Sequence, residues 1–221
     1  MSQAASADLN ALPGVLSPSR PGAEPLAKVM LKAARFERPP YIPVRFHVNE
    51  SCWRYYPKAA LEDLMASHPL IFPNFNPRPA GFKANLAPFA TAGADFTDDW
   101  GCVWRTTEDG ITGTVIRHPL ADWATLDTQP RPDWRVSDGR VPVDRAQISK
   151  NLARLKDQGL PVQGSLRHGH TFLQLCDLLG YEALIMDMAD EEPRLDELCD
   201  LVGGFNESIV RWFISEGANW M

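Results

Sequence analysis

Hydrophobic positions recur at helical spacing early in the chain. Between residues 25 and 36, apolar side chains stand at positions i, i+3, i+4 and i+7, which is the spacing of an amphipathic helix. The prolines at positions 39 and 40 cannot continue that helix. A second apolar face runs through Lys58–Ser67, and Pro57 before it suits a first helical turn. The pattern therefore predicts two helices in the first third of the chain.

Two other segments have the alternating pattern of strands. In residues 41–48 (YIPVRFHV), apolar side chains occupy every second position, which predicts a strand with polar residues at its end. Farther along, the β-rich runs DFTDDWGCVW and ITGTVI flank Asp109-Gly110, a pair that is common in tight turns. The sequence thus predicts a hairpin between residues 95 and 116.

The last part of the chain alternates between the two patterns. Asp144 can cap a helix that extends to about Asp157 and ends at Gly159. After it, the sequence predicts a strand over 160–166, a helix over 171–179, a strand over 183–186, a helix over 193–215 and the first steps of another strand over 217–221. We expect Gly203-Gly204 to interrupt the last helix locally.

This β-α-β-α order is typical of parallel βα units and predicts an α/β fold. A closed (β/α)8 TIM-type barrel takes roughly 250 residues or more, and the chain has 221. We therefore expect a barrel that is incomplete at the C-terminus, with a smaller open α/β sheet as the alternative. The sequence predicts a flexible leader over residues 1–24 and the barrel domain over residues 25–221. An open barrel exposes strand edges, so we also expect poor solubility or a homodimer.

Charge and cysteine usage narrow the classes of partner. A formal net charge of -6 offers no basic surface for phosphates, so nucleic acid and anionic membranes are poor partners and a small-molecule substrate is favoured. The four cysteines lie far apart, which suits reduced thiols. The first residues lack the pattern of a signal peptide, and no apolar run is long enough to span a membrane. We expect a cytoplasmic protein.

A resemblance to a known family rests on several segments. Residues 93–104 (GADFTDDWGCVW) are followed by Gly113 and by RHPLADW at 117–123; RPPYIPV precedes them, and GLPVQGSL and LLGYEALIMDM follow. In content and order these segments resemble the uroporphyrinogen-decarboxylase superfamily, and its corrinoid-dependent methyltransferase-like branch more than its decarboxylases. The resemblance covers roughly residue 38 to the end.

The resemblance implies a TIM-type barrel whose active site lies at the carboxyl ends of the strands, and it implies methyl-group chemistry. The cofactor would be a corrinoid (methylcobamide), with a corrinoid protein as a partner. Methyltransferases of this kind also hold zinc through a late histidine and cysteines, which would lie beyond residue 221. The matching residues do not include those ligands.

Two alternatives to methyl transfer remain open. One is decarboxylation of a tetrapyrrole acid; but the arginine-rich segment of such enzymes corresponds here to residues 46–54, where His, Asn and Glu replace arginines, and only Arg45, Arg54 and Arg167 are candidates to bind carboxylates. The other alternative is a non-catalytic protein that binds a corrinoid protein.

Several residues are candidates for acid–base chemistry. His168 and His170 follow a predicted strand, where imidazoles can act as acid and base, although His170 or Thr171 can equally cap the next helix. Asp187 follows another predicted strand and can orient a substrate or a histidine, or simply cap a helix.

The remaining candidates are carboxylates and polar residues near predicted strand ends. Asp95, Asp98 and Asp99 lie close together in sequence, and like charges raise one pKa of such a group; a surface turn is the alternative. We expect Asp99 to act with the histidines. Substrate binding is predicted for a further set of side chains, namely Arg45, His47, Asn49, Asp98 and Trp100. The tryptophans at 53, 100, 104 and 123 can line a flat tetrapyrrole pocket, but core packing is the favoured interpretation.

Overall fold

The computed structural model describes residues 24, 26–44, 46–69, 71–72, 75–157 and 162–221. The chain divides into two compact units, residues 1–85 (unit 1) and 86–221 (unit 2). Each unit is described by itself. The expected division into a leader over 1–24 and one barrel domain over 25–221 stays a prediction.

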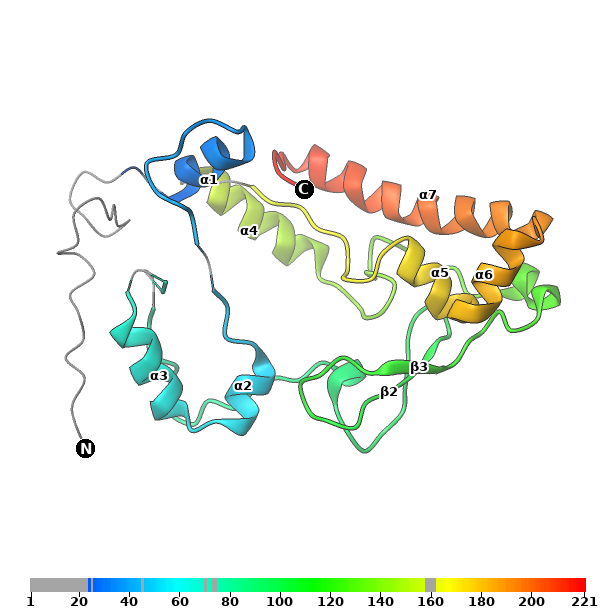
Figure 1. Cartoon of the computed structure of the whole chain (residues 1–221), viewed down its shortest axis with the longest axis horizontal. Helices are drawn as coiled ribbons and strands as arrows, with labels where there is room; N and C mark the ends of the chain where they lie inside the picture. Colours follow the sequence, from blue (N-terminus) through cyan, green and yellow to red (C-terminus); the bar gives the residue numbers. More distant parts are fainter. Residues whose placement is uncertain (1–23, 25, 45, 70, 73–74, 158–161) are drawn as a thin grey trace. The chain divides into compact units, whose positions relative to one another are not determined.

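Unit 1 contains three described helices, which are labelled in Figure 1: α1 (Leu26–Ala34), α2 (Glu50–Tyr55) and α3 (Lys58–Ser67). The first and third confirm the helices predicted from apolar spacing, and Pro57 directly precedes α3. The Trp53 ring lies edge-on to the Phe82 ring, with 5.6 Å between centroids. Aromatic packing therefore joins α2 to the segment that follows α3.

The predicted strand over 41–48 is wrong. Its described residues, 41–44 and 46–48, form neither a strand nor a ladder. Ile42 is 83% exposed and Phe46 58% exposed, so this apolar alternation is not buried against any neighbour. An alternating segment becomes a strand only when a partner strand satisfies its backbone groups.

Unit 2 contains a three-stranded antiparallel sheet in the order β1-β2-β3. Its strands are β1 (Phe96–Thr97), β2 (Val103–Arg105) and β3 (Thr114–Arg117). The β2–β3 pair confirms the predicted hairpin, with Asp109-Gly110 inside its loop and a register irregularity between Val103 and Trp104. A Cβ atom on Gly113 would lie 2.3 Å from the Arg105 carbonyl oxygen. Only glycine fits at that point of the hairpin.

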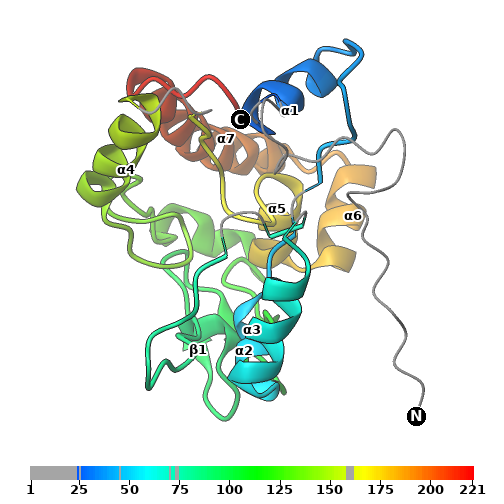
Figure 2. The ribbon, with the colours of Figure 1, turned by 90° about the vertical axis from the view of Figure 1, so that its left-hand side faces the viewer.

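Helices make up most of the regular secondary structure described in unit 2 (Figure 2). The helix α4 (Arg145–Asp157) begins where Asp144 Oδ1 accepts the Gln147 N–H at 2.9 Å, which confirms the predicted cap, while Gly159 lies outside the described residues. Two further predicted helices are confirmed, α5 (Phe172–Leu179) and α7 (Pro193–Ser215). Unit 2 also contains two short 3-10 helices, η2 (Pro88–Ala90) and η3 (Trp123–Thr128).

The predicted strand over 183–186 is also wrong, because these residues lie inside a helix, α6 (Tyr181–Ala189). A run of four apolar residues fits either a buried strand or a helix. The flanking residues favour the helix: Glu, Ala, Leu and Met are strong helix formers. Gly180, with φ of 91°, separates α5 from α6 and lets the chain turn between them.

The predicted strand over 160–166 is replaced by an extended segment with one isolated bridge. Residues 160 and 161 lie outside the described part of the chain. Gln163 pairs in parallel with Trp220, and the Gly164 N–H donates to the Trp220 carbonyl at 2.8 Å. The predicted first steps of a strand at 217–221 therefore amount to this single parallel bridge.

The last helix is continuous, so the predicted interruption at Gly203-Gly204 is wrong. Both glycines lie on the exposed side of α7, and a Cβ atom at either would meet nothing within 4 Å. On the opposite side, α7 buries an apolar row: Leu198, Val202, Phe205, Ile209 and Phe213. Burial of this row offsets the low helix propensity of the two glycines.

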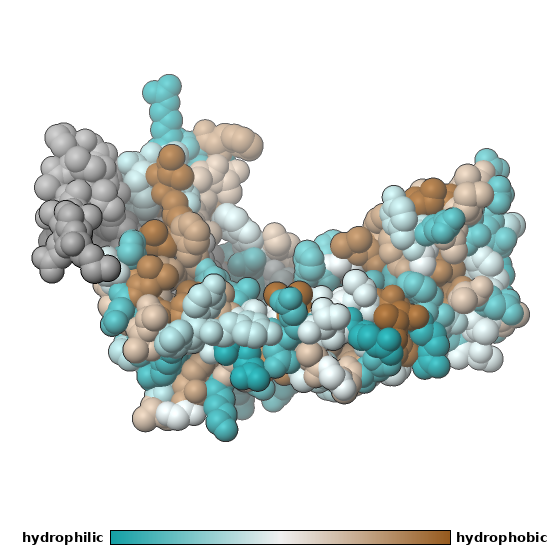
Figure 3. Space-filling model, turned by 60° about the horizontal axis from the view of Figure 1, so that its bottom comes forward, coloured by the Kyte–Doolittle hydropathy of each residue, from teal (hydrophilic) through white to brown (hydrophobic). Residues whose placement is uncertain are grey.

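The core of unit 2 joins α7 to α5 and to the sheet. Leu178 and Leu184 are fully buried in it, together with Trp100 and Trp104. At the right-hand end of Figure 3, which belongs to unit 2, small hydrophobic groups are scattered among hydrophilic ones. The described residues form a mixed structure of helices and an antiparallel sheet; the (β/α)8 barrel and the homodimer stay predictions.

Candidate functional site

Four charged side chains lie together inside unit 2: Asp98, Arg140, Arg167 and Asp177, here named the charge cluster. Asp98 and Arg140 are only 5% and 7% exposed. Arg167 forms an ion pair with Asp177 at 3.0 Å, and the Arg140 charge interacts with the other three. Charged residues are seldom buried without partners, so the bonding of each member decides what the cluster can do.

Asp98 is the best satisfied member of the charge cluster. Its Oδ1 atom accepts the backbone N–H groups of Trp100 and Cys102 at 3.0 and 2.8 Å, and its Oδ2 atom accepts the Trp104 indole N–H at 2.8 Å. Burial raises the pKa of the Asp98 carboxyl, and the hydrogen bond from Trp104 opposes that shift. These bonds fix the turn between β1 and β2.

Asp177 links α5 to the segment around Arg167. The Arg167 Nη2 atom donates to its carboxylate at 3.0 Å. Burial raises the pKa of Asp177, and the bond from Arg167 opposes the shift. The Asp177 carbonyl oxygen also accepts the Cys102 thiol at 3.3 Å and lies 2.9 Å from His118 Nδ1. Two side chains thus satisfy a carbonyl at the C-terminal end of α5.

Arg140 is held by aromatic rings rather than by an acid. Its guanidinium carbon lies 4.2 Å from the Trp104 ring centroid and 4.7 Å from that of Phe89. The Nε atom of Arg140 is buried and has no hydrogen-bond partner among the described residues. Burial lowers the Arg140 pKa, and the nearby Arg167 charge lowers it further.

Several buried polar atoms in this region have no hydrogen-bond partner among the described residues. They include Arg140 Nε, Arg167 Nε, Arg167 Nη1 and both amide atoms of Gln174. Buried polar groups are nearly always hydrogen-bonded in native proteins, and an exception calls for a structural or functional reason. The charge cluster therefore holds spare N–H donors that can bind an oxygen acceptor.

The three aspartates grouped in the sequence have separate environments. Asp95 accepts two hydrogen bonds from Arg105, each at 2.8 Å, and this hydrogen bonding lowers the pKa of Asp95. Asp99 accepts the Ser137 hydroxyl. The predicted effect of like charges is wrong, because burial raises the Asp98 pKa and neighbouring carboxylates do not contribute. The roles of Asp98 and Asp99 in binding and acid–base chemistry stay predictions.

The two candidate histidines stand on the surface beside α5. His168 and His170 are exposed, and His170 Nδ1 lies 2.9 Å from Thr171 Oγ1. Thr171 is the N-cap residue of α5, with φ of 56° and no side-chain cap bond. The structure places both imidazoles where they can exchange protons with solvent, and their acid–base role stays a prediction.

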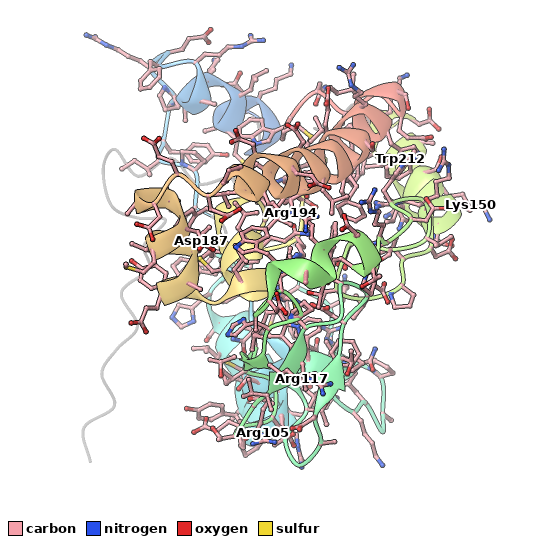
Figure 4. The ribbon with its side chains drawn as sticks, turned by 90° about the vertical axis from the view of Figure 1, so that its right-hand side faces the viewer. Arg105, Arg117, Lys150, Asp187, Arg194 and Trp212 are labelled. Atoms are coloured by element: carbon pink, nitrogen blue, oxygen red, sulfur yellow. The ribbon has the colours of Figure 1, made fainter. Side chains whose placement is uncertain are left out.

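Asp187 is not at a strand end, as expected from the sequence. It lies in α6, as Figure 4 shows, and its backbone carbonyl accepts the Glu192 N–H at 2.9 Å. Figure 4 also shows Arg194 near the start of α7, where its guanidinium donates to the Trp123 carbonyl and to Asp127 at 2.8 Å each. Because residues 183–186 are helical, Asp187 does not follow a strand, and this reason for its predicted role no longer holds.

The candidates in unit 1 are polar residues around the start of α2. Asn49 is the N-cap of this helix, and its Oδ1 atom accepts the Cys52 N–H at 2.9 Å. His47 is exposed, and Arg45 lies outside the described residues. Asn49 thus has a structural role, which sequence reasoning did not assign, and substrate binding by these three residues stays a prediction.

Core packing of the tryptophans is confirmed where they are buried. Trp53, Trp100 and Trp104 are at most 8% exposed. The Trp100 ring lies edge-on to Phe205, with 5.3 Å between centroids. Buried rings of this kind do not fit the wall of a pocket for a flat corrinoid. Substrate binding by Trp100 stays a prediction.

Sequence reasoning named two of the four members of the charge cluster, Asp98 and Arg167, and missed the other two. Arg167 was a candidate only as a binder of carboxylates, and Arg140, Asp177 and Gln174 gave no signal. Asp138-Gly139 indicates a turn, and that turn positions Arg140: Asp138 Oδ1 accepts the Arg140 N–H at 2.8 Å. Nothing in the local sequence shows that the Arg140 side chain turns inward toward Trp104.

The described residues include no group of three or more His, Cys, Asp or Glu side chains that can hold a metal ion, so they do not fit a zinc site. In the same part of the chain, no helix has the length and apolar character needed to cross a membrane. Comparison with family models, curated proteins and solved structures gives no match.

Proposed function

We propose that this protein is a cytoplasmic enzyme similar to the uroporphyrinogen-decarboxylase superfamily, and that it transfers a methyl group between a corrinoid and a small-molecule acceptor. The segments at 93–104, 159–166 and 178–188 support the resemblance to this family. A corrinoid protein is the proposed partner that brings the cofactor. The described residues fit neither zinc nor a flat corrinoid wall.

The observation that carries this choice of reaction is the charge balance of the site. Two guanidinium groups, of Arg140 and Arg167, lie with two carboxyl groups, of Asp98 and Asp177, and a third carboxyl group, of Asp138, also interacts with Arg140. A substrate with many carboxylates, such as a tetrapyrrole acid, needs a surplus of positive charge. The charge cluster has no such surplus, which supports a substrate with at most one anionic group.

The proposed role of the charge cluster is to bind and orient the methyl acceptor. Phe89 and Trp104 shield the Arg140 guanidinium from water, and hydrogen bonds in such surroundings are stronger than in water. Holding an acceptor in one orientation lowers the entropic cost of a bimolecular transfer. His168 and His170 are proposed to accept the proton that the acceptor releases, as imidazoles do near neutral pH.

A carboxy-lyase is the second candidate, and one observation favours it. Three guanidinium N–H donors, at Arg140 Nε, Arg167 Nε and Arg167 Nη1, have no partner among the described residues. Arginines with free donors are typical binders of carboxylates. Decarboxylation of an acid with a single carboxylate near the site would agree with both the donors and the charge balance.

The reaction is tested on the full chain with methylcobalamin as the methyl donor and 3-mercaptopropionate as the acceptor. The absorbance spectrum follows loss of the methylated corrinoid, and mass spectrometry follows the methyl thioether. Enzyme-dependent thioether formation supports the proposal. Absence of enzyme-dependent thioether would overturn it, and release of carbon dioxide from a supplied monocarboxylic acid would then favour the carboxy-lyase.

A further inference from the structure

We propose that Arg140 and Arg167 together bind one carboxylate group, and that the substrate of this protein is therefore a small monocarboxylic acid. This names the substrate class of the proposed enzyme and so rests on the proposed function, although carboxylate binding itself does not depend on any reaction.

The first support is the way Arg140 is held. A guanidinium group is planar, and its N–H bonds point outward in its own plane. Trp104 and Phe89 contact the guanidinium of Arg140 at 4.2 and 4.7 Å from their ring centroids. Aromatic rings stacked on an arginine occupy its faces and leave its N–H edges free. The Arg140 Nε atom is buried without a hydrogen-bond partner among the described residues, and the residue as a whole is 7% exposed.

The second support is the state of Arg167. Its side chain is 4% exposed and uses Nη2 for the bond to Asp177. Its Nε and Nη1 atoms, which lie on different sides of the guanidinium group, are buried without partners. Burial lowers the pKa of Arg140, and repulsion from the nearby Arg167 charge lowers it further. An anion that accepts hydrogen bonds from both would convert this repulsion into attraction.

The charge of the donors favours a carboxylate over water. Arg140 Nε and one of the two free Arg167 atoms belong to separate guanidinium groups, and the two oxygens of one carboxylate can accept from both while supplying a negative charge that water lacks. The Gln174 amide, 1% exposed and unpartnered at both atoms, lies one turn before Asp177 on the same side of α5. Its Nε2 group can donate to a carboxylate oxygen, whereas its Oε1 atom needs a separate N–H or O–H donor.

The charges of the cluster favour a single carboxylate over phosphate. Asp98 and Asp177 already balance the two arginines, and the Asp138 charge also interacts with Arg140. A carboxylate adds one negative charge beside them, and a phosphate dianion adds nearly two at neutral pH. The same repulsion excludes acids with several carboxylates. The geometry thus selects a compact anion with one charge and two in-plane oxygens.

The test observes the arginine Nε–H groups directly by ¹H–¹⁵N NMR of the full chain. The two buried signals are assigned by their loss in Arg140→Lys and Arg167→Lys. Acetate is the probe, and inorganic phosphate and chloride are compared with it. We expect acetate to shift both signals with saturation, and at least tenfold weaker binding in Arg140→Lys. Arg117→Lys, at an exposed arginine of β3, should bind acetate as the wild type does.

Absence of saturable shifts with acetate, or equal binding in wild type and Arg140→Lys, would overturn the inference, as would tighter binding of phosphate. Circular dichroism of Arg140→Lys confirms its fold, and Gln174→Leu gives a second variant that keeps both arginines and should also weaken binding. Acetate binding without methyl transfer would reject the proposed function alone. Methyl transfer without acetate binding would reject the carboxylate site alone.

Discussion

The Trp104 indole N–H donates to Asp98 Oδ2 at 2.8 Å, and the Trp104 ring in turn lies against the Arg140 guanidinium at 4.2 Å. One side chain therefore connects the aspartate that shapes the β1–β2 turn to the arginine with free donors. Both contacts are buried. The stability of the sheet and the chemistry of the charge cluster depend on the same tryptophan.

Asp98→Asn should destabilise the protein by about 1–3 kcal/mol, the cost of an unsatisfied buried donor. The amide oxygen can still accept the N–H groups of Trp100 and Cys102, but the new NH2 group would face the Trp104 N–H. Urea unfolding measures the loss. Asp95→Asn, which breaks the exposed pair with Arg105, is the control and should change the midpoint little. Equal losses in both variants would contradict this account of Asp98.

Gly203→Ala and Gly204→Ala should each stabilise the protein by about 0.5–1 kcal/mol, because alanine has the higher helix propensity. Both positions are exposed in α7, and an added Cβ atom meets nothing within 4 Å. Thermal unfolding followed by circular dichroism measures the gain. A loss of stability in both variants would show that the helix is interrupted there.

Gly139→Ala should have the opposite effect, with a loss of order 1–3 kcal/mol from backbone strain alone. Its φ is 93°, and a Cβ atom would lie 2.7 Å from Trp100 Nε1 and 3.2 Å from Phe205 Cε1. Gly81→Ala is the matched control, since its φ is 75° but the space around it is open. We expect the loss at Gly139 to exceed that at Gly81, and the reverse order in urea midpoints would contradict the packing described here.

The pH dependence of stability should show the raised pKa of Asp177. Its folded pKa lies above the ordinary value of 3.8, so the folded state binds more protons than the unfolded state as pH rises above 3.8. The contribution of this carboxyl to stability must then fall as pH rises through its folded pKa. We expect the free energy of unfolding of wild type minus that of Asp177→Asn to decrease over this range. An increase would mean that the Arg167 pair outweighs burial.

Thiol labelling should separate the buried cysteine from the exposed one. Burial raises the Cys102 pKa strongly, and Asp98 and Asp177 raise it further, so little of the reactive thiolate forms. Cys199 is exposed. Ellman's reagent should modify Cys199 in the native protein and Cys102 only in urea. Labelling of Cys102 in the native state, located by peptide mass mapping, would contradict its burial.

Local sequence predicts the helices that have their own start and stop residues. Asp144 caps α4, and α7 begins at Pro193. Local sequence does not predict α6, because its short apolar run fits either a strand or a helix. The turn at Gly180 and the packing of Leu184 favour the helix. The site is less predictable still, because the burial of Arg140 depends on Phe89 and Trp104, which are distant in sequence.

The most direct test of the central claim compares two thiol acceptors in methyl transfer from methylcobalamin. 3-Mercaptopropionate carries one carboxylate, and 2-mercaptoethanol carries none. If Arg140 and Arg167 bind a carboxylate of the acceptor, kcat/KM should be at least tenfold higher for 3-mercaptopropionate, and Arg140→Lys should remove that preference. Equal kcat/KM values for the two acceptors in the wild-type protein would contradict the claim.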